Sequence, residues 1–425
     1  MQINKKTYHI ITIGCQMNKS DSERMRSLLD DNNFTEANRE KAGIVILNTC
    51  GVRQSAEDRI YGLVPKIKKM NPDSLIVLAG CLSLREDVKE RIGKYVNIWL
   101  PAMEIPHLLK LINEDDFDDS LDPREYLSIV PKYNSQISAF VPIGNGCDNF
   151  CAYCVVPYAR GREAYRDKKD VLREVKSLVE NDYKEITLIA QNVNSYFSGE
   201  VKFPELLKSA SEVSGDFWLR FATSHPKDMS DELIQIIAEN DKLCEHIHLP
   251  VQAGDDEVLS RMNRKYTIKH YKGLIEKIRD KIPNASISTD IIVGFPGETN
   301  MQFENTVNLF RELKFDMAYI AQYSPRPGTA AEKMRDDVDK EEKIRREKEL
   351  TRILRQTALE NNKNYLNNEV CVLIEGINKK RNLYGKTRTS KNVRIIGDCP
   401  DSLVGTFQNI KIEEVEDFGM KGYLI

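Results

Sequence analysis

The chain has 425 residues, of which 41% are hydrophobic and 30% charged, and its formal net charge is −3. This length predicts two or three domains, and the small net charge excludes nucleic-acid binding driven by the charge of the whole molecule, so that any RNA contact would need a local basic patch. No run of 18 apolar residues is present, so we expect no membrane partner.

Residues 1–125 are predicted to form a parallel α/β domain. Apolar runs at 8–13, 44–47, 75–79 and 96–100 alternate with helical patterns near 20–29, 56–70 and 85–92. Ser20 and Glu23 have the spacing of a capping box, which predicts that the first helix begins near Ser20.

The start of the chain leads directly into the first strand, so we expect no signal peptide and a cytoplasmic protein. The acidic segment 113–125 predicts a solvated linker.

Residues 133–362 are predicted to form a partial (β/α)6 barrel. Its strands are expected at 139–143, 185–190, 217–223, 246–251, 285–293 and 317–323, too few to close an eight-fold barrel. The charged segment 333–364 carries a helical apolar stripe and is expected to pack on this barrel. Residues 363–425, with strand patterns at 370–374, 393–396 and 407–412, predict a small β-barrel.

Nine cysteines in a chain without a secretion signal favour reduced thiols and metal ligation over disulfides. Cys147, Cys151 and Cys154 form a C-x3-C-x2-C run directly after the first strand of the predicted partial barrel. Three thiolates can bind three irons of a four-iron cluster and leave the fourth iron open for a ligand. A zinc knuckle completed by a distant His is the alternative, since structural zinc needs a fourth ligand and the run contains none.

A second set of cysteines is dispersed in the sequence but follows predicted strands in the same way. Cys15, Cys50 and Cys81 each come within two or three residues of a strand end. The carboxyl ends of parallel strands meet at one edge of a sheet, so these thiols are expected to converge and to hold a second cluster. The other reading of each cysteine is a small buried side chain.

The chain resembles the methylthiotransferases, a two-cluster family of radical S-adenosylmethionine (SAM) enzymes. The resemblance covers nearly the full length, with a radical SAM core and a C-terminal domain of the TRAM type. It rests on Gly14-Cys15-Gln16-Met17-Asn18, Asn48-Thr49-Cys50, Gly80-Cys81, Cys154-Val155-Val156-Pro157-Tyr158, Arg160-Gly161-Arg162-Glu163, Gln191-Asn192-Val193-Asn194-Ser195-Tyr196, His248-Leu249-Pro250-Val251-Gln252-Ala253-Gly254, Gly294-Phe295-Pro296-Gly297-Glu298-Thr299 and Tyr323-Ser324-Pro325-Arg326-Pro327-Gly328-Thr329.

The resemblance implies two 4Fe–4S clusters, each with three Cys ligands, and SAM as cofactors. The cluster on the central cysteines would reduce SAM to a 5′-deoxyadenosyl radical, and the cluster on the N-terminal cysteines would present sulfur. The residues after the first cysteine, Gln16-Met17-Asn18, resemble those found at this place in the tRNA enzymes that methylthiolate carbon 2 of N6-(dimethylallyl)adenosine at position 37. The same chemistry on N6-threonylcarbamoyladenosine or on a ribosomal protein side chain is the alternative, and a non-catalytic, zinc-containing RNA-binding protein is a more distant one.

Further residues are candidates for cofactor contact. Gln191, Arg220 and Gln252 lie at or near predicted strand ends, where polar heads would face the cavity and could contact SAM or RNA. Tyr153 lies between two cluster cysteines, with simple packing as its alternative role. The segment containing Gly294 and Glu298 resembles the SAM-adenine loop of radical SAM enzymes.

A basic stretch in the tail is the candidate contact for tRNA. It contains Lys379, Lys380, Arg381, Lys386, Arg388, Lys391 and Arg394, with Tyr384 among them and no acidic residue. Such a patch binds phosphates while an aromatic ring stacks a base; the alternative is a solvated hairpin without a partner. We also expect an electron donor such as flavodoxin or ferredoxin, and a monomer.

Overall fold

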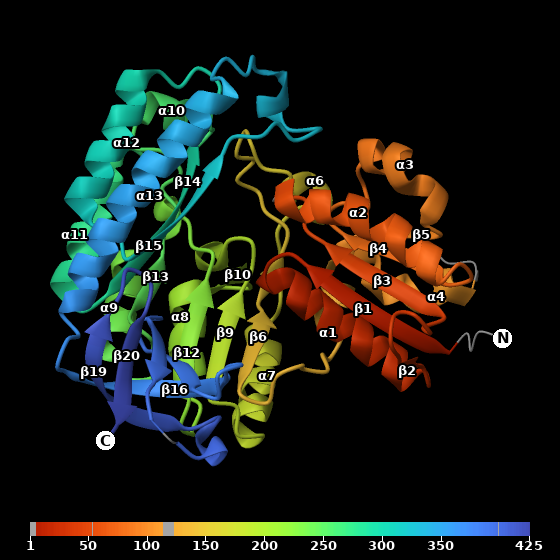
Figure 1. Ribbon diagram of the computed structural model, residues 1–425, viewed down its shortest axis with the longest axis horizontal. Coiled ribbons are helices and arrows are strands. Elements are labelled where there is room, and N and C mark those ends of the chain that lie inside the picture. The colour runs from red at the N-terminus through yellow and green to blue at the C-terminus, as the bar shows by residue number, and fades with distance from the viewer. Residues whose placement is uncertain (1–5, 53, 114–122, 398) are drawn as a thin grey trace.

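The computed structural model describes residues 6–52, 54–113, 123–397 and 399–425. An N-terminal parallel sheet with its helices, a central partial barrel and a small C-terminal β-barrel follow one another along the chain (Figure 1). This confirms the predicted α/β fold class. Most of the predicted acidic linker, residues 114–122, lies outside the described residues.

The N-terminal sheet has five parallel strands in the order β2-β1-β3-β4-β5. Its strands are β1 Thr7–Ile13, β2 Thr35–Glu36, β3 Ile44–Thr49, β4 Leu75–Gly80 and β5 Ile98–Leu100. The helices of this region are α1 Gln16–Asp31, α2 Gln54–Met70, α3 Glu86–Ile92, η1 Gly93–Tyr95, η2 Ala102–His107, α4 Leu108–Asn113 and α5 Pro123–Ser128. Every residue of β3 is buried, as expected for a central parallel strand covered on both faces.

The first helix begins earlier than its sequence pattern predicted. Helix α1 starts at Gln16, with Cys15 at its N-cap, and the backbone N–H of Cys15 donates to Oδ1 of Asn18 at 3.2 Å. Ser20 is buried within the helix, so the predicted cap at Ser20 is wrong. A side chain at Gly14 would place its Cβ 2.1 Å from Asn18 Oδ1, so this tight entry into α1 requires glycine.

The central region contains six parallel strands in two hydrogen-bonded sets, β6-β9-β12 and β13-β14-β15. A parallel bridge from Leu219 to Leu243 joins the two sets and completes the partial barrel. Its strands are β6 Ser138–Pro142, β9 Glu185–Ile189, β12 Trp218–Ala222, β13 His246–His248, β14 Ser286–Val293 and β15 Met317–Gln322. The six-unit partial barrel predicted from the sequence is confirmed.

Helices cover the outside of this barrel (Figure 1). The helices of this region are α6 Val156–Arg160, α7 Lys168–Glu180, η3 Val193–Ser195, α8 Phe203–Ser211, η4 Pro226–Asp228, α9 Asp231–Glu239, α10 Asp256–Arg261, α11 Ile268–Lys281, α12 Asn300–Leu313 and η5 Ala330–Lys333, of which α6 lies at the boundary with the N-terminal domain. Short strands β7 Gly144–Asn145, β8 Ala164–Tyr165, β10 Phe197–Ser198 and β11 Val201–Lys202 lie in the loops. The long charged helix α13, Lys340–Lys363, packs on α12 and β15, where Leu350, Ile353 and Leu354 join the barrel core.

The C-terminal residues form a closed barrel in the order β16-β17-β18-β20-β19. Its elements are β16 Glu369–Ile377, β17 Leu383–Thr387, β18 Asn392–Ile395, η6 Asp401–Leu403, β19 Phe407–Val415 and β20 Met420–Leu424. Alternate residues of these strands, such as Val372, Ile374, Val393 and Ile395, fill its interior.

The turn between β17 and β18 docks on the partial barrel, and it uses three residues that the sequence assigned to ligands. Arg220 pairs with Glu185 at 2.5 Å and donates to the backbone carbonyls of Thr387 and Arg388. Lys391 is buried and pairs with Asp316 at 2.6 Å.

Arg388 of the C-terminal barrel pairs with Glu245 of the partial barrel at 2.9 Å. The predicted cofactor contact for Arg220 and the predicted RNA contacts for Arg388 and Lys391 are therefore corrected, because their charges are satisfied where the two barrels meet.

Within the described residues, no helix is long and apolar enough to cross a membrane.

Candidate functional site

The central cysteine run lies on the loop that follows β6 and β7 and ends at α6. The backbone N–H of Cys147 donates to the carbonyl of Gly161 at 3.2 Å, and that of Ala152 donates to Met262 at 2.9 Å. The Ala152 carbonyl accepts from the N–H of Ala331 at 2.7 Å. These backbone bonds hold the loop against three separate segments of the partial barrel. The thiols of Cys151 and Cys147 lie close enough to Cys154 for their charges to add to the rise that burial causes in its pKa.

The second set of cysteines converges as predicted. Cys15, Cys50 and Cys81 follow β1, β3 and β4, which are neighbours in the sheet. A hydrogen bond between the Cys15 and Cys50 thiols lowers the pKa of Cys15 and raises that of Cys50, and the charge of Cys81 raises the pKa of Cys50 further. The parallel strands thus bring together three thiols that are spread over residues 15–81 of the chain.

The two cysteine sets adjoin each other across the boundary between the N-terminal sheet and the partial barrel. A Cβ built on Gly51, next to Cys50, would lie 3.1 Å from the Cys81 Cβ and 3.5 Å from a methyl group of Val155, next to Cys154. Burial raises the pKa of Cys154 to about 12, and the charge of Cys81 adds to this shift. The loops of Cys50 and Cys81 therefore lie against the loop that carries Cys154.

A buried ion pair holds this boundary on one side. Arg160, at the end of α6, is 2% exposed and binds Asp21 of α1 at 2.5 Å. Asp21 also accepts from the Tyr126 hydroxyl, and Arg160 donates to Oδ1 of Asn145 at 3.0 Å. Helix α1, whose N-cap is Cys15, is thereby fixed to α6, which follows Cys154.

A second group of charges holds the other side. Arg326, in the loop after β15, donates to Glu57 at 3.2 Å, to Gln54 at 2.8 Å and to the carbonyl of Val52 at 3.1 Å. Glu57 also pairs with Arg85 at 2.6 Å. Because Val52 and Arg85 follow Cys50 and Cys81 closely in the sequence, these contacts set the position of both cysteine loops.

Several thiols accept hydrogen bonds of the kind that stabilises a thiolate ligand. The backbone N–H groups of Val52 and Val156 donate to Cys50 and Cys154, each at 3.4 Å. Asn149 donates to Cys147 at 3.4 Å, and Arg264 donates to Cys151 at 3.6 Å. In the part of the chain that the structure describes, no group of three or more His, Cys, Asp or Glu residues has the geometry to hold a metal ion. That criterion applies to a single metal ion. In a cubane cluster each thiolate binds a different iron, so the three thiols of each set are a suitable donor set for a cluster.

Three of the predicted cofactor contacts lie around the central cysteine run. Tyr153 packs on an apolar cluster that includes Ala253 and Phe295, which are the neighbours in sequence of Gln252 and Gly294. Burial raises the pKa of Tyr153 well above its usual value. Gln252 has φ of +74° and is bridged through its backbone to β14.

Gln191 belongs to a row of buried polar atoms at the ends of β9 and β12. Among the described residues, Gln191 Oε1, Asn192 Oδ1 and Ser224 Oγ have no hydrogen-bond partner. Buried polar groups are ordinarily paired, so this row is the place where a bound ligand would complete the hydrogen bonding.

His225 adjoins this row and was not singled out from the sequence. Its Nδ1 accepts the backbone N–H of Lys227 at 3.2 Å, which leaves the proton on Nε2. Burial lowers the pKa of His225 to about 2. Ser224 and His225 belong to no recognisable sequence motif, so their place beside these buried polar atoms became visible only in the folded structure.

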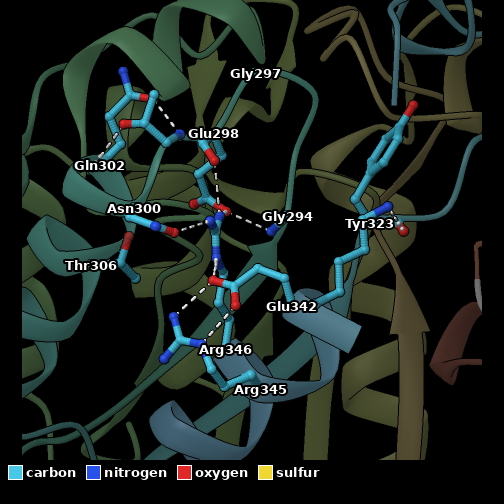
Figure 2. Close-up of polar contacts among 12 residues, drawn as sticks. Gly294, Gly297, Glu298, Asn300, Gln302, Thr306, Tyr323, Glu342, Arg345 and Arg346 are labelled. Carbon is cyan, nitrogen blue, oxygen red and sulfur yellow. Dashed lines mark hydrogen bonds and ion pairs between the residues drawn. The ribbon is translucent and has the colours of Figure 1, made fainter. Parts of the chain in front are cut away.

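Glu298 stabilises its own loop, as Figure 2 shows. Its carboxylate pairs with Arg346 of α13 at 2.8 Å and accepts the backbone N–H of Gly294 at 2.5 Å. The prediction that Glu298 contacts the cofactor is corrected, because its buried carboxylate is already satisfied. Gly294 has φ of +69°, and a Cβ there would lie 2.4 Å from the Lys343 side chain, so glycine is needed at this turn.

The remaining basic residues of the tail stay on the surface. Lys379, Lys380, Arg381 and Arg394 are exposed, and Arg394 pairs across β17 and β18 with Tyr384, which is 41% exposed. Arg381 pairs with Asp401, and Lys386 pairs with Glu375.

Comparisons with known proteins agree with this arrangement. Residues 141–310 match the Radical SAM superfamily, and residues 7–100 match the uncharacterized protein family UPF0004. A tRNA-2-methylthio-N(6)-dimethylallyladenosine synthase of Thermoanaerobacter pseudethanolicus is 43% identical over 98% of this chain and 92% of its own length. The protein of the same name from Carboxydothermus hydrogenoformans is 41% identical over 99% of this chain and 100% of its own.

The chain belongs to the family of tRNA-2-methylthio-N(6)-dimethylallyladenosine synthases. It is a radical SAM enzyme, and membership of that superfamily implies SAM and a 4Fe–4S cluster as cofactors. Among solved structures, the radical SAM methyltransferase TsrM of Kitasatospora setae superposes with a TM-score of 0.55 at 14% identity, covering 77% of each chain. The radical enzyme OxsB also gives 0.55, at 10% identity, covering 81% of this chain and 56% of its own. These two structures share the fold.

Replacing Arg160 by Met should lower the free energy of unfolding by about 3–5 kcal/mol, because Asp21 would remain buried without its cation. Chemical denaturation measures this loss. Arg162→Met is the matched control: Arg162 pairs with Asp148 on the surface and should cost at most about 1 kcal/mol. Equal losses in the two variants would contradict a special role for the buried pair.

Stability should also depend on His225 at acidic pH. Its folded pKa lies below the unfolded value, so the unfolded chain gains the proton first as the pH falls below 6.5, and stability is lost from there down to about pH 2. The slope from this residue is about 1.4 kcal/mol per pH unit. Denaturation of His225→Asn and the wild type between pH 7 and 5 should show a shallower loss in the variant. Parallel curves would contradict the assignment.

Proposed function

We propose that this chain methylthiolates carbon 2 of N6-(dimethylallyl)adenosine at position 37 of tRNA. The observation that carries the proposal is that two three-cysteine sets from different domains lie next to each other at the boundary between those domains. Full-length relatives that carry the name of this activity support the choice of substrate.

Within this proposal, Cys147, Cys151 and Cys154 hold one 4Fe–4S cluster and Cys15, Cys50 and Cys81 hold a second. With SAM bound, the clusters would supply the radical that breaks an unactivated C–H bond and the sulfur of the product, and SAM would supply the methyl group. The chain itself donates hydrogen bonds to the thiolates and joins the loops of the two sets through the Arg160–Asp21 and Arg326–Glu57 pairs. The unpartnered polar atoms near Gln191 and Ser224 are the proposed contacts for SAM or the substrate nucleoside.

We assign residues 1–125, 133–362 and 363–425 to the methylthiotransferase, radical SAM and TRAM-like domains. The exposed basic residues of the last domain, Lys379, Lys380, Arg381 and Arg394, would bind tRNA phosphates. The proposal also includes reduction by a flavodoxin or ferredoxin, a monomeric state and a cytoplasmic location.

The proposal is tested by mass spectrometry of tRNA nucleosides from cells that lack the gene. The methylthio group of dimethylallyladenosine should be absent, and wild type should restore it. Cys147→Ala and Cys50→Ala should each abolish restoration, because each removes one thiolate from a separate set. Cys244→Ala is the control, since Cys244 is buried beside Trp218 away from both sets and should restore the modification.

Loss of the methylthio group from threonylcarbamoyladenosine would keep the chemistry and change the substrate. An unchanged nucleoside profile would reject tRNA as the substrate.

A further inference from the structure

Two aromatic rings stand exposed at the central cysteine run. Phe150 immediately precedes Cys151 and is 37% exposed, and Tyr158 lies in α6, four residues after Cys154, and is 54% exposed. Their centroids are 6.2 Å apart and their planes meet at 84°. Large aromatic side chains are ordinarily buried, so an exposed pair beside reactive groups points to a ligand.

The backbone at Phe150 is held in an unusual conformation. Its φ is +46°, in the left-handed region that is costly for a bulky residue. Asn263 donates its side-chain amide to the Phe150 carbonyl at 2.8 Å, and the next N–H but one, that of Ala152, donates to Met262. The ring is therefore presented by a loop that the barrel holds in place, and such strain is typical of functional sites.

The charges around the rings indicate which part of a nucleic acid would bind. The Arg162 guanidinium lies over the Phe150 ring, with Cζ 5.4 Å from the centroid, and is paired with Asp148 at 3.2 Å. Glu163 accepts the backbone N–H of Asp148 and adds a second carboxylate. These acids disfavour a phosphate here, whereas a neutral base can stack on an aromatic face or on the guanidinium plane.

The Phe150 and Tyr158 rings also lie close to the cysteines in the chain. They belong to the loop that carries Cys147, Cys151 and Cys154 and to α6, which the Arg160–Asp21 pair fixes to the N-terminal domain. A base that stacks there would thus be held beside the nucleotide undergoing reaction.

We propose that Phe150 and Tyr158 form a stacking platform for an unpaired base next to the adenosine that is modified. This inference rests on the proposed function, because it takes an RNA loop as the substrate. It adds a recognition element distinct from the basic residues of the C-terminal barrel.

The test uses the full-length enzyme with both clusters and an RNA stem-loop that carries dimethylallyladenosine, with fluorescent 2-aminopurine beside it. Phe150→Leu and Tyr158→Leu keep apolar bulk but remove the π face, while Phe150→Tyr and Tyr158→Phe keep it. Each Leu variant should weaken RNA binding by about 5- to 150-fold, raise KM more than it lowers kcat, and relieve the quenching of 2-aminopurine. Each aromatic variant should remain close to wild type.

Iron and sulfide content separates stacking from damage to the cluster loop. If Phe150→Leu loses iron, Tyr158→Leu, which lies outside the cysteine run, decides. Wild-type binding and quenching in Leu variants with full iron would overturn the platform and leave the proposed function standing, and loss of iron from both would overturn it as well. A wild-type enzyme that neither binds nor modifies the stem-loop would overturn the proposed function itself.

Discussion

The buried pair between Arg160 and Asp21 is the constraint on which the arrangement of the site depends. It ties α1, whose N-cap is Cys15, to α6, which follows Cys154, and both side chains are almost completely buried. Burying two charges is costly unless their hydrogen bonds are satisfied, and here Tyr126 and Asn145 provide the remaining partners. The pair is strong only in one geometry, so it specifies how the two domains meet.

The other interdomain contacts extend this rigid frame. Arg326 and Glu57 secure the loops of Cys50 and Cys81 from the opposite side, and Arg220 and Lys391 secure the C-terminal barrel to the base of the partial barrel. Each contact joins segments remote in the sequence through a charge that is largely removed from water. These contacts restrain the loops of the two cysteine sets relative to each other, because breaking either ion pair would leave a buried charge unpaired.

Sequence patterns predicted the elements well where periodicity alone decides them. The six strands of the partial barrel and the convergence of the N-terminal cysteines follow from alternating strands and helices. The start of α1 was wrong because Asn18 gives Cys15 a cap that outcompetes the Ser20 pattern. The roles of Arg220, Arg388, Lys391 and Glu298 were wrong for a different reason: a charge near a strand end or in a basic run looks the same whether its partner is a ligand or a distant carboxylate.

The sequence by itself determined the fold class, the two sets of thiols and the family, since spacing along the chain encodes which residues follow which strand. Only the tertiary structure decided that the two sets adjoin and which charged side chains form ion pairs at the boundaries between domains. It also revealed the exposed pair of Phe150 and Tyr158 and the buried His225. Those features arise from contacts between residues far apart in the chain, where burial and partner geometry set the energy, and neither quantity is local to the sequence.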